Sequence, residues 1–243
     1  MSGRAAMTLT PELVARVHRQ VPDPGPAVMK KEPMSDADYR AMAEALMETH
    51  PRGEDVWVFA YGSLIWKPAC DIDGQLTAHL HGWHRKFCMR LVRYRGTPEC
   101  PGLMMSLDRG GSCRGVVQRL PASAAAERIE LLLRREISVK PPAHSPRWVP
   151  VTSDGKRLRA IVFAVDPKAT NYSGDHTLEE TAAILAKACG HWGTGAEYLM
   201  HTVAHLEDLG IHDRYLWKLQ AQVAELIARE MEPALPEIMA ESM

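Results

Sequence analysis

The chain has 243 residues, of which 46% are hydrophobic and 24% charged, and its formal net charge is −1. A chain of this length can bury one sizeable core. The near-neutral charge excludes a broad electrostatic surface for nucleic acid or an anionic membrane. No apolar run approaches the roughly 20 residues of a membrane span, and the N-terminal segment lacks the apolar centre of a secretory signal. We therefore expect neither a nucleic-acid nor a membrane partner.

Cysteine usage indicates the cellular compartment. The number of cysteines is odd, and no two of them have the spacing of a metal-binding or redox-active pair. They are Cys70, Cys88, Cys100, Cys113 and Cys189. This pattern favours reduced thiols in a cytoplasmic protein over a disulfide framework or a structural zinc site.

Residues 1–53 are predicted to form an N-terminal helical and proline-rich extension. A short amphipathic piece at 11–21 is followed by four prolines between positions 22 and 33. A helix is expected from Asp36 to about Glu48, because Ser35 and Asp38 have the spacing of a capping box. The composition leaves two alternatives open, which are packing over the main domain and partial disorder.

Residues 56–60 (VWVFA) are five consecutive apolar residues and predict a fully buried strand. Tyr61, Gly62 and Ser63 then interrupt the apolar pattern. Gly62 permits a close approach of another group to the main chain, where backbone N–H groups can bind an anionic or carbonyl oxygen. From spacing alone, an ordinary bulge in a buried strand is the favoured explanation of the break.

The region 56–165 is rich in strand patterns. Segments 103–107 and 115–120 flank glycine-containing turn residues and predict a first hairpin, and segments 148–152 and 158–165 predict a second. Between them, a helix is expected from Ser123 to about residue 135.

The region 177–231 is predicted to be helical. Thr177 with Glu180, and Thr194 with Glu197, have capping-box spacing, and a last helix is expected at 213–231. Because strands are grouped first and helices last, the order of elements indicates an α+β fold and not a doubly wound parallel sheet.

Glu136 is a candidate acid–base group at the C-terminal end of the 123–135 helix. The negative end of the helix dipole disfavours the charge of a carboxylate there and raises its pKa, while Arg134 and Arg135 act in the opposite direction. A raised pKa suits a general base that works near neutral pH. A solvated surface glutamate paired with a neighbouring arginine is the alternative from position alone.

The histidines give little support for a metal site. His201 and His205 are four residues apart on a predicted helix, and His79 and His81 share one side of a predicted strand. No carboxylate or cysteine at ligand spacing completes either pair, so we expect helix-surface or core histidines and no metal.

Five ordered stretches of the sequence carry a resemblance to a known family. They are VFAYGSLIWKP (58–68), RGTP with PG (95–98 and 101–102), LDRGGSCRGVVQRL (107–120), RE (135–136) with PRW (146–148), and GAEYL (195–199). Together they resemble the ChaC family of glutathione-specific gamma-glutamylcyclotransferases over about residues 55–230.

The resemblance implies a fold and a reaction. The implied fold is α+β, a small mixed β-barrel of the gamma-glutamylcyclotransferase-like type with packed C-terminal helices, spanning residues 54–232 and followed by a tail at 233–243. The implied enzyme is a carbon–nitrogen lyase that converts glutathione to 5-oxoproline and cysteinylglycine. It requires no cofactor and no metal.

The resemblance also assigns the site residues. Glu136 matches the catalytic glutamate, as general base and then general acid. The substrate loop is implied to hold the γ-glutamyl carboxylate or the developing oxyanion through its backbone N–H groups; its residues are Tyr61, Gly62, Ser63 and Leu64. Tyr198 would line the pocket with its hydroxyl on the substrate. Arg95 would bind a substrate carboxylate or brace a loop by a salt bridge. Trp66 and Trp83 fit the core better than the site.

The segment 137–145 departs from the family pattern, because it has two prolines and lacks the aromatic residue that follows RE in many relatives. Either His144 or Ser145 is available to replace the missing hydroxyl. The departure leaves two alternatives open: a cyclotransferase for other γ-glutamyl amines or dipeptides, and a catalytically silent binding module on the same scaffold.

Overall fold

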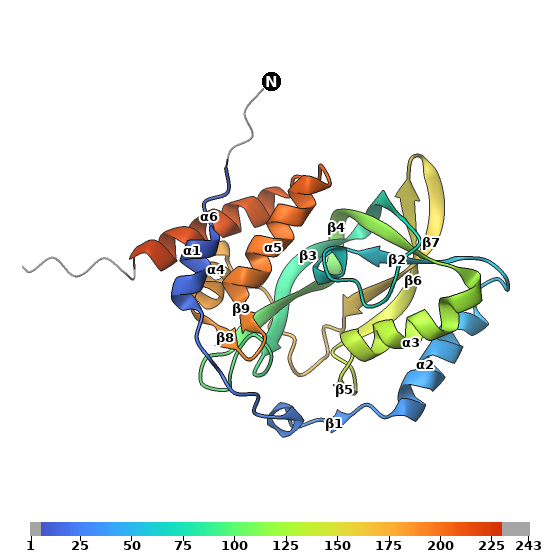
Figure 1. Ribbon diagram of the computed structural model, residues 1–243, viewed down its shortest axis with the longest axis horizontal. Helices are drawn as coiled ribbons and strands as arrows, with labels where there is room; N and C mark the ends of the chain where they lie inside the picture. The colour runs from blue at the N-terminus through green and yellow to red at the C-terminus, as the bar shows by residue number, and fades with distance from the viewer. Residues whose placement is uncertain (1–5, 230–243) are drawn as a thin grey trace, which may run out of the picture.

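A closed barrel of five strands forms the centre of the part of the chain that this computed structural model describes, residues 6–229 (Figure 1). The strands are β2 (Val56–Ala60), β3 (Gln75–Leu91), β4 (Gly102–Leu120), β6 (His144–Ser153) and β7 (Lys156–Val165). They are ordered β2-β4-β3-β6-β7, and a parallel pairing of β2 with β7 closes an otherwise mostly antiparallel barrel. The predicted α+β fold with a small mixed barrel is confirmed.

Strand β2 lies between two hydrophobic cores, which explains its continuous apolar run. Phe59 faces the barrel interior, where the core continues to the C-terminal helices. Val56, Val58 and Ala60 face a second core on the outer surface of the barrel. Strand β2 therefore ends in a region that packing holds rigid on both sides, directly before Tyr61.

The hairpin predicted around residues 108–111 is wrong. Strand β4 runs through this region without a turn and pairs with β3 along its length. Gly110 and Gly111 have positive φ angles of 97° and 64° and lie opposite a register shift between His81 and Trp83. The glycines therefore form a bulge that bends a long strand around the barrel, because a strand of 19 residues must curve to stay paired.

The second predicted hairpin is confirmed as β6 and β7. Asp154 and Gly155 connect the strands with positive φ angles of 46° and 74°. Two residues with positive φ give the tight turn whose twist matches that of the strands.

Helices lie on two sides of the barrel (Figure 1). On one side, α2 (Asp36–Glu48) packs against α3 (Ala125–Glu136), which follows a short 3₁₀ turn at Ala122–Ala124. On the other side lie α1 (Pro11–Val17), α4 (Leu178–Lys187), α5 (Gly195–Asp208) and α6 (Arg214–Arg229). The end of the helix predicted at 213–231, and the tail predicted at 233–243, lie outside the described residues. Within 6–229, no helix has the length and apolar character needed to cross a membrane.

Two of the three predicted capping boxes are confirmed in full, at Ser35 with Asp38 and at Thr177 with Glu180. At the third, the Thr194 side chain accepts a hydrogen bond from the backbone N–H of Glu197. The Glu197 carboxylate does not accept the second hydrogen bond of a capping box, from the Thr194 backbone N–H, because it binds Arg95. Helix α5 follows a two-stranded ribbon, β8 (Cys189–Gly190) with β9 (Gly193–Thr194).

The described part of the N-terminal extension packs across the molecule from α6 to α3. The backbone N–H groups of Thr8 and Leu9 both donate to the Gln220 side chain of α6. Farther along, β1 (Glu32–Pro33) pairs with β5 (Val139–Lys140), and the Tyr39 hydroxyl donates to the Ile137 carbonyl at 2.7 Å. The extension therefore contacts the segment that directly follows Glu136.

Candidate active site

The loop Tyr61–Leu64 leaves the end of β2 and is held by two buried side chains from neighbouring barrel strands. Arg85 Nε donates to the Tyr61 carbonyl at 2.7 Å, and Gln118 Nε2 donates to the Leu64 carbonyl at 2.8 Å. Arg85 is itself fixed by Asp213 at 3.0 Å. Because these donors bind the loop carbonyls from the barrel side, the loop has a defined backbone conformation before any substrate arrives.

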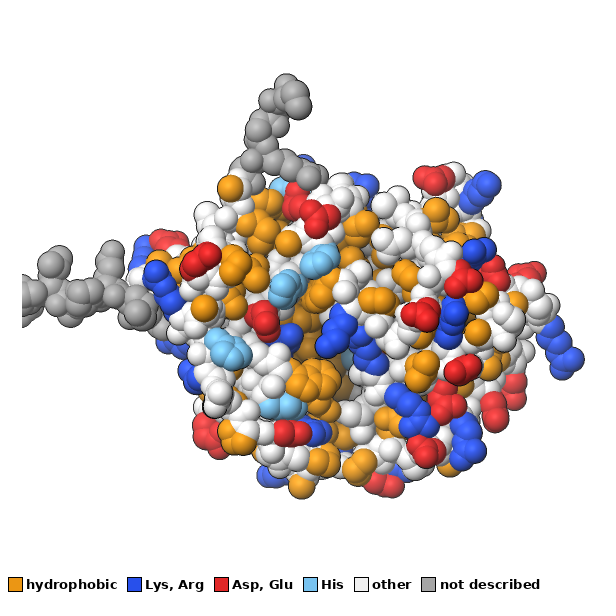
Figure 2. All heavy atoms as spheres, viewed as in Figure 1, with side chains coloured by type: hydrophobic (Ala, Val, Ile, Leu, Met, Phe, Trp, Pro, Cys, Tyr) orange, Lys and Arg blue, Asp and Glu red, His pale blue; other side chains and the backbone are white. Residues whose placement is uncertain are grey.

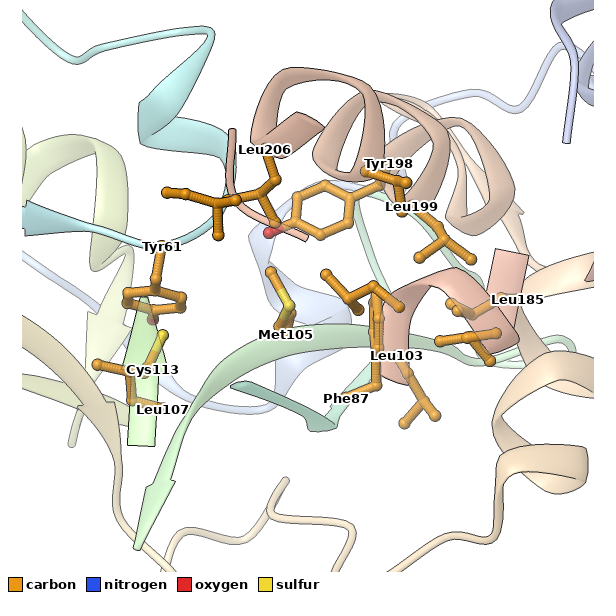
Figure 3. Packing of buried hydrophobic residues seen from close by; sticks show 14 of the residues in the cluster. Tyr61, Phe87, Leu103, Met105, Leu107, Cys113, Leu185, Tyr198, Leu199 and Leu206 are labelled. Atoms are coloured by element: carbon orange, nitrogen blue, oxygen red, sulfur yellow. The ribbon is translucent and has the colours of Figure 1, made fainter. Parts of the chain in front are cut away.

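Tyr61 has only its backbone available to the candidate site, since its side chain is bonded elsewhere. Its hydroxyl donates to the Phe163 carbonyl at 2.9 Å, and burial raises its pKa well above the usual range. Figure 3 shows the hydroxyl directed toward the strands that carry Leu107 and Cys113, away from Tyr198. The side chain therefore anchors the loop to the barrel.

Tyr198, in the first turn of α5, meets the loop directly. Its hydroxyl oxygen lies 2.7 Å from the position that a Cβ on Gly62 would occupy. The backbone N–H of Ser63 donates to this hydroxyl, and burial together with the charge of Glu136 raises the pKa of Tyr198 to about 12. Tyr198 thus keeps its proton at neutral pH, and only glycine at position 62 allows this approach.

Glu136 is the last residue of α3, as predicted, and its side chain is 17% exposed. Burial raises its pKa from about 4.5 to about 7, with Arg135 acting in the opposite direction. The direction agrees with the sequence-based expectation, and the main cause is burial, which the sequence did not indicate. Position at a helix end cannot reveal how deeply a side chain lies.

His144 lies beside Glu136. Its Nε2–H donates to the Glu136 carbonyl at 2.7 Å, and the same nitrogen is 3.9 Å from Glu136 Oε2. Burial lowers the pKa of His144, which keeps the ring neutral at neutral pH. The altered segment 137–145 therefore places an imidazole, and not a hydroxyl, against the candidate base.

Arg135 connects α3 to the loop. Its Nε is 3.6 Å from Glu136 Oε1, and its Nη2 donates to Ser63 Oγ at 3.3 Å. The pKa values of both Tyr61 and Tyr198 are raised in part by the charge of Glu136. The structure thus brings together Glu136, the 61–64 loop and Tyr198, which are far apart in sequence.

Arg95 takes part in a salt bridge at the edge of the site. Its Nη1 donates to Glu197 Oε2 at 2.6 Å and to the Thr194 carbonyl at 2.8 Å. The guanidinium also lies 5.6 Å from the centre of the Tyr198 ring. Of the two roles that the sequence leaves open for Arg95, this geometry matches the brace between the 95–102 loop and the start of α5.

The histidine pairs do not meet acidic or thiol groups in the arrangement of a metal centre. His201 and His205 lie on α5 and pack their rings near Trp66. Among residues 6–229, no group of three or more histidine, cysteine, aspartate or glutamate side chains is placed to hold a metal ion. Trp83 is buried in the core, as expected, whereas Trp66 is partly buried and contacts Tyr198.

Figure 2 shows a hollow near the centre of the viewed face, with hydrophobic side chains at its base and histidine and basic side chains around it. Two other hollows, of about 320 and 470 Å³, adjoin Arg157–Arg159 on strand β7 and contain none of the predicted site residues. Glu136, the 61–64 loop and Tyr198 thus lie apart from these two hollows.

Sequence reasoning missed the residues that hold the loop, Arg85 and Gln118. A signal for Arg85 was present, because it stands between Trp83 and Phe87 in an alternating pattern whose inward positions are buried. A charged residue at such a position requires an internal partner. Gln118 lies within a run of buried residues, where no alternation distinguishes it.

Similarity to known proteins agrees with this geometry. Residues 56–226 match the family described as ChaC-like protein. The glutathione-specific gamma-glutamylcyclotransferase of Escherichia coli is 38% identical over 79% of this chain and 83% of its own length, and that of Schizosaccharomyces pombe is 29% identical over 71% and 94%. A crystal structure of the yeast cyclotransferase superposes with a TM-score of 0.64 at 24% identity, covering 70% of this chain and 96% of that one. The chain therefore belongs to the ChaC-like family.

Proposed function

We propose that this protein cleaves glutathione by cyclising its γ-glutamyl group, which gives 5-oxoproline and cysteinylglycine. The observation that carries the proposal is a buried glutamate, Glu136, with a pKa of about 7 next to a rigid backbone loop. The names of the relatives in Escherichia coli and Schizosaccharomyces pombe support glutathione as the substrate.

The reaction requires positioning and one proton carrier. Glu136 takes a proton from the α-amine of the γ-glutamyl group, and the amine nitrogen attacks the γ-carbonyl carbon to close a five-membered ring. The bond from this carbon to the cysteine nitrogen then breaks, and Glu136 returns a proton to that nitrogen. Holding the chain folded on itself supplies several kcal/mol, up to roughly 7–11 in ideal cases.

This scheme assigns a role to each of the remaining site residues. The backbone N–H groups of the 61–64 loop bind the γ-glutamyl carboxylate or the oxyanion that develops on the γ-carbonyl. Tyr198 is neutral and fixed by Ser63, so its hydroxyl proton is available to a substrate oxygen. His144 holds the backbone of Glu136 and thereby its orientation.

The test is to incubate the purified protein with glutathione and to measure 5-oxoproline. Formation of 5-oxoproline and cysteinylglycine in equal amounts is the expected result. Product from γ-glutamyl-alanine but not from glutathione would select a cyclotransferase for other γ-glutamyl compounds. Absence of product from every γ-glutamyl compound would select a silent binding module.

We also propose a cytoplasmic location, as the cysteine pattern indicates. All five cysteines lie within the described residues and are free thiols. Burial raises the pKa of Cys88 to about 12 and that of Cys113 to about 11, which keeps these thiols protonated and poorly reactive. Localisation by fractionation of the producing cell tests this proposal.

Replacing Tyr198 by phenylalanine is expected to lower kcat/KM for glutathione about tenfold, because one neutral hydrogen bond to the substrate is lost. The Ser63 N–H also loses its acceptor. Steady-state 5-oxoproline formation measures the effect. Tyr215→Phe is the control, since Tyr215 lies on α6, and it should stay within about twofold of wild type. Equal activity of Tyr198→Phe and wild type would show that the Tyr198 hydroxyl takes no part in the reaction.

Replacing Arg95 by glutamine is expected to destabilise the fold by about 1 kcal/mol, because a partly exposed salt bridge to Glu197 is lost. Glu197→Gln should have the same effect, and the double variant should lose no more than either single variant. Urea unfolding measures all three. A tenfold rise of KM in Arg95→Gln, with no such rise in Glu197→Gln, would instead assign Arg95 to a substrate carboxylate.

A further inference from the structure

Four arginines lie on the elements that carry the candidate site or hold its loop, and three of them are neutralised by acidic side chains outside the reaction. Arg85 binds Asp213, Arg95 binds Glu197, and Arg134 binds both Glu130 and Asp36. The fourth is Arg135. Within residues 6–229, its one acidic neighbour closer than 4 Å is Glu136 itself.

The contact between Arg135 and Glu136 is loose. Their closest charged atoms are 3.6 Å apart, whereas the Arg95 and Glu197 pair approaches to 2.6 Å. Glu136 must also accept and release a proton in each turnover, so it cannot neutralise Arg135 throughout the reaction. A guanidinium with five N–H donors therefore faces the site with most of them unused.

Arg135 touches both halves of the site. Its Nη2 reaches Ser63 Oγ on the loop, and its Nε lies beside the Glu136 carboxylate on α3. Its side chain is 22% exposed, so it has access to a ligand. A substrate bound between Glu136 and the loop must pass against this guanidinium.

The chemistry of a γ-glutamyl peptide matches this position. Glutathione carries one carboxylate on the same carbon as the reacting amine and another at its glycine end. Planar guanidinium groups bind carboxylates through paired, charge-assisted hydrogen bonds. Because the α-amine and the α-carboxylate are attached to one carbon, an amine bound to Glu136 places the α-carboxylate close to the adjacent Arg135. The glycine carboxylate lies farther along the glutathione molecule.

We propose that Arg135 binds a carboxylate of the γ-glutamyl substrate, in the place that the sequence offered to Arg95. This inference rests on the proposed function and deepens it, because it makes a free carboxylate a requirement for efficient turnover. Arg95 is held by Glu197 and braces the site, while Arg135 orients the substrate toward Glu136.

The first experiment compares Arg135→Gln with Arg134→Gln, a matched control on the same helical turn. Arg135→Gln is expected to lower kcat/KM for glutathione about 10- to 100-fold, mainly through KM, because a hydrogen-bonded charge pair is lost. Arg134→Gln should stay within about threefold of wild type. Equal activities of the two variants would overturn the proposal.

Two analogues identify the carboxylate. γ-Aminobutyryl-cysteinylglycine lacks the α-carboxylate, and glutathione with a C-terminal carboxamide lacks the glycine carboxylate. Whichever carboxylate binds Arg135, its removal should abolish the difference between wild type and Arg135→Gln, while the other analogue should preserve it. A difference of the same size with glutathione and with both analogues would contradict binding of either carboxylate.

A pH profile separates this role from an effect on Glu136. The positive charge of Arg135 lowers the pKa of Glu136, so Arg135→Gln should move the acid limb of the rate profile to higher pH for every substrate. The expected loss persists on the high-pH plateau. If activity there equals wild type, Arg135 acts only through Glu136 and the proposal fails.

Folding and function are controlled separately. Thermal unfolding establishes whether each variant is folded. If Arg135→Gln is not folded, Arg135→Lys is tested in its place. The lysine variant keeps the charge but loses the paired donors, so an intermediate loss is expected. A wild-type protein that forms no 5-oxoproline refutes the proposed function, whereas active wild type with full activity in both Arg135 variants refutes only this inference.

Discussion

Glu136→Gln is expected to lower kcat for 5-oxoproline formation by about 10²- to 10⁴-fold, the range for loss of a general acid–base group. Glutamine keeps the size and the buried position of the side chain, but it cannot accept a proton from the α-amine. Binding of 5-oxoproline should change little, because the loop and Tyr198 remain. A variant with more than a tenth of the wild-type kcat would remove Glu136 from the proton-transfer step.

The pH dependence of the wild-type rate is a second readout of Glu136. As the proposed base, Glu136 must be ionised to act, and burial raises its pKa to about 7. We therefore expect kcat/KM to fall about tenfold for each pH unit below 7 and to level off above it. A limb near pH 4.5 would show that the glutamate is solvated in the working enzyme.

Stability should respond to pH in the opposite direction. The folded state holds the Glu136 proton more tightly than the unfolded state, whose carboxyl has the usual pKa near 4.5. Raising the pH from about 4.5 to 7 therefore lowers the free energy of unfolding, by up to about 3 kcal/mol for this shift. Glu136→Gln lacks this loss, so its stability relative to wild type should increase over the same interval. Urea unfolding at pH 5 and pH 8 measures the difference.

Gly62→Ala is expected to reduce kcat/KM about 100-fold. The added Cβ would lie 2.7 Å from the Tyr198 hydroxyl and 3.1 Å from Met105 Cε, so either the loop or the Tyr198 side chain must shift from its position in the site. A displacement of about 1 Å at a positioning element has this order of effect on rate. Figure 3 shows how closely Met105 and Tyr198 pack at this point.

A second substitution tests the cause of that loss. Tyr198→Phe removes the oxygen that clashes, so the double variant should be more active than Gly62→Ala alone, although Tyr198→Phe is itself harmful. The overpacked single variant should also be less stable, by about 1–3 kcal/mol. Multiplicative losses in the double variant would show that the alanine acts without the Tyr198 contact.

The sequence predicted the elements whose signals are local. The helix at 36–48 begins at a capping box, β2 is a continuous apolar run, and β6 with β7 flank a turn that needs positive φ angles. Each of these features depends on neighbouring residues. The bulge at Gly110 and Gly111 was misread as a turn, because glycine favours both and only the pairing of β4 with β3 distinguishes them.

The candidate site shows the same limit of the sequence. Motif resemblance proposed Glu136 and the 61–64 loop, but the sequence cannot show which charges meet. The sequence leaves both a substrate carboxylate and a bracing salt bridge open for Arg95, and only the tertiary structure pairs Arg95 with Glu197. The burial that raises the pKa of Glu136 likewise depends on distant elements that cover it.

The contacts of the N-terminal extension limit how far the protein can be shortened from its N-terminal end. Similarity to the family begins at residue 56, but Asp23 binds Arg93 at 2.7 Å beside the Arg95 loop, and β1 supplies the edge partner of β5. A truncated chain that starts at residue 54 would leave β5 unpaired and the apolar face of α3 open to water. We expect such a fragment to aggregate or to lose the geometry around Glu136, although every matched motif would still be present.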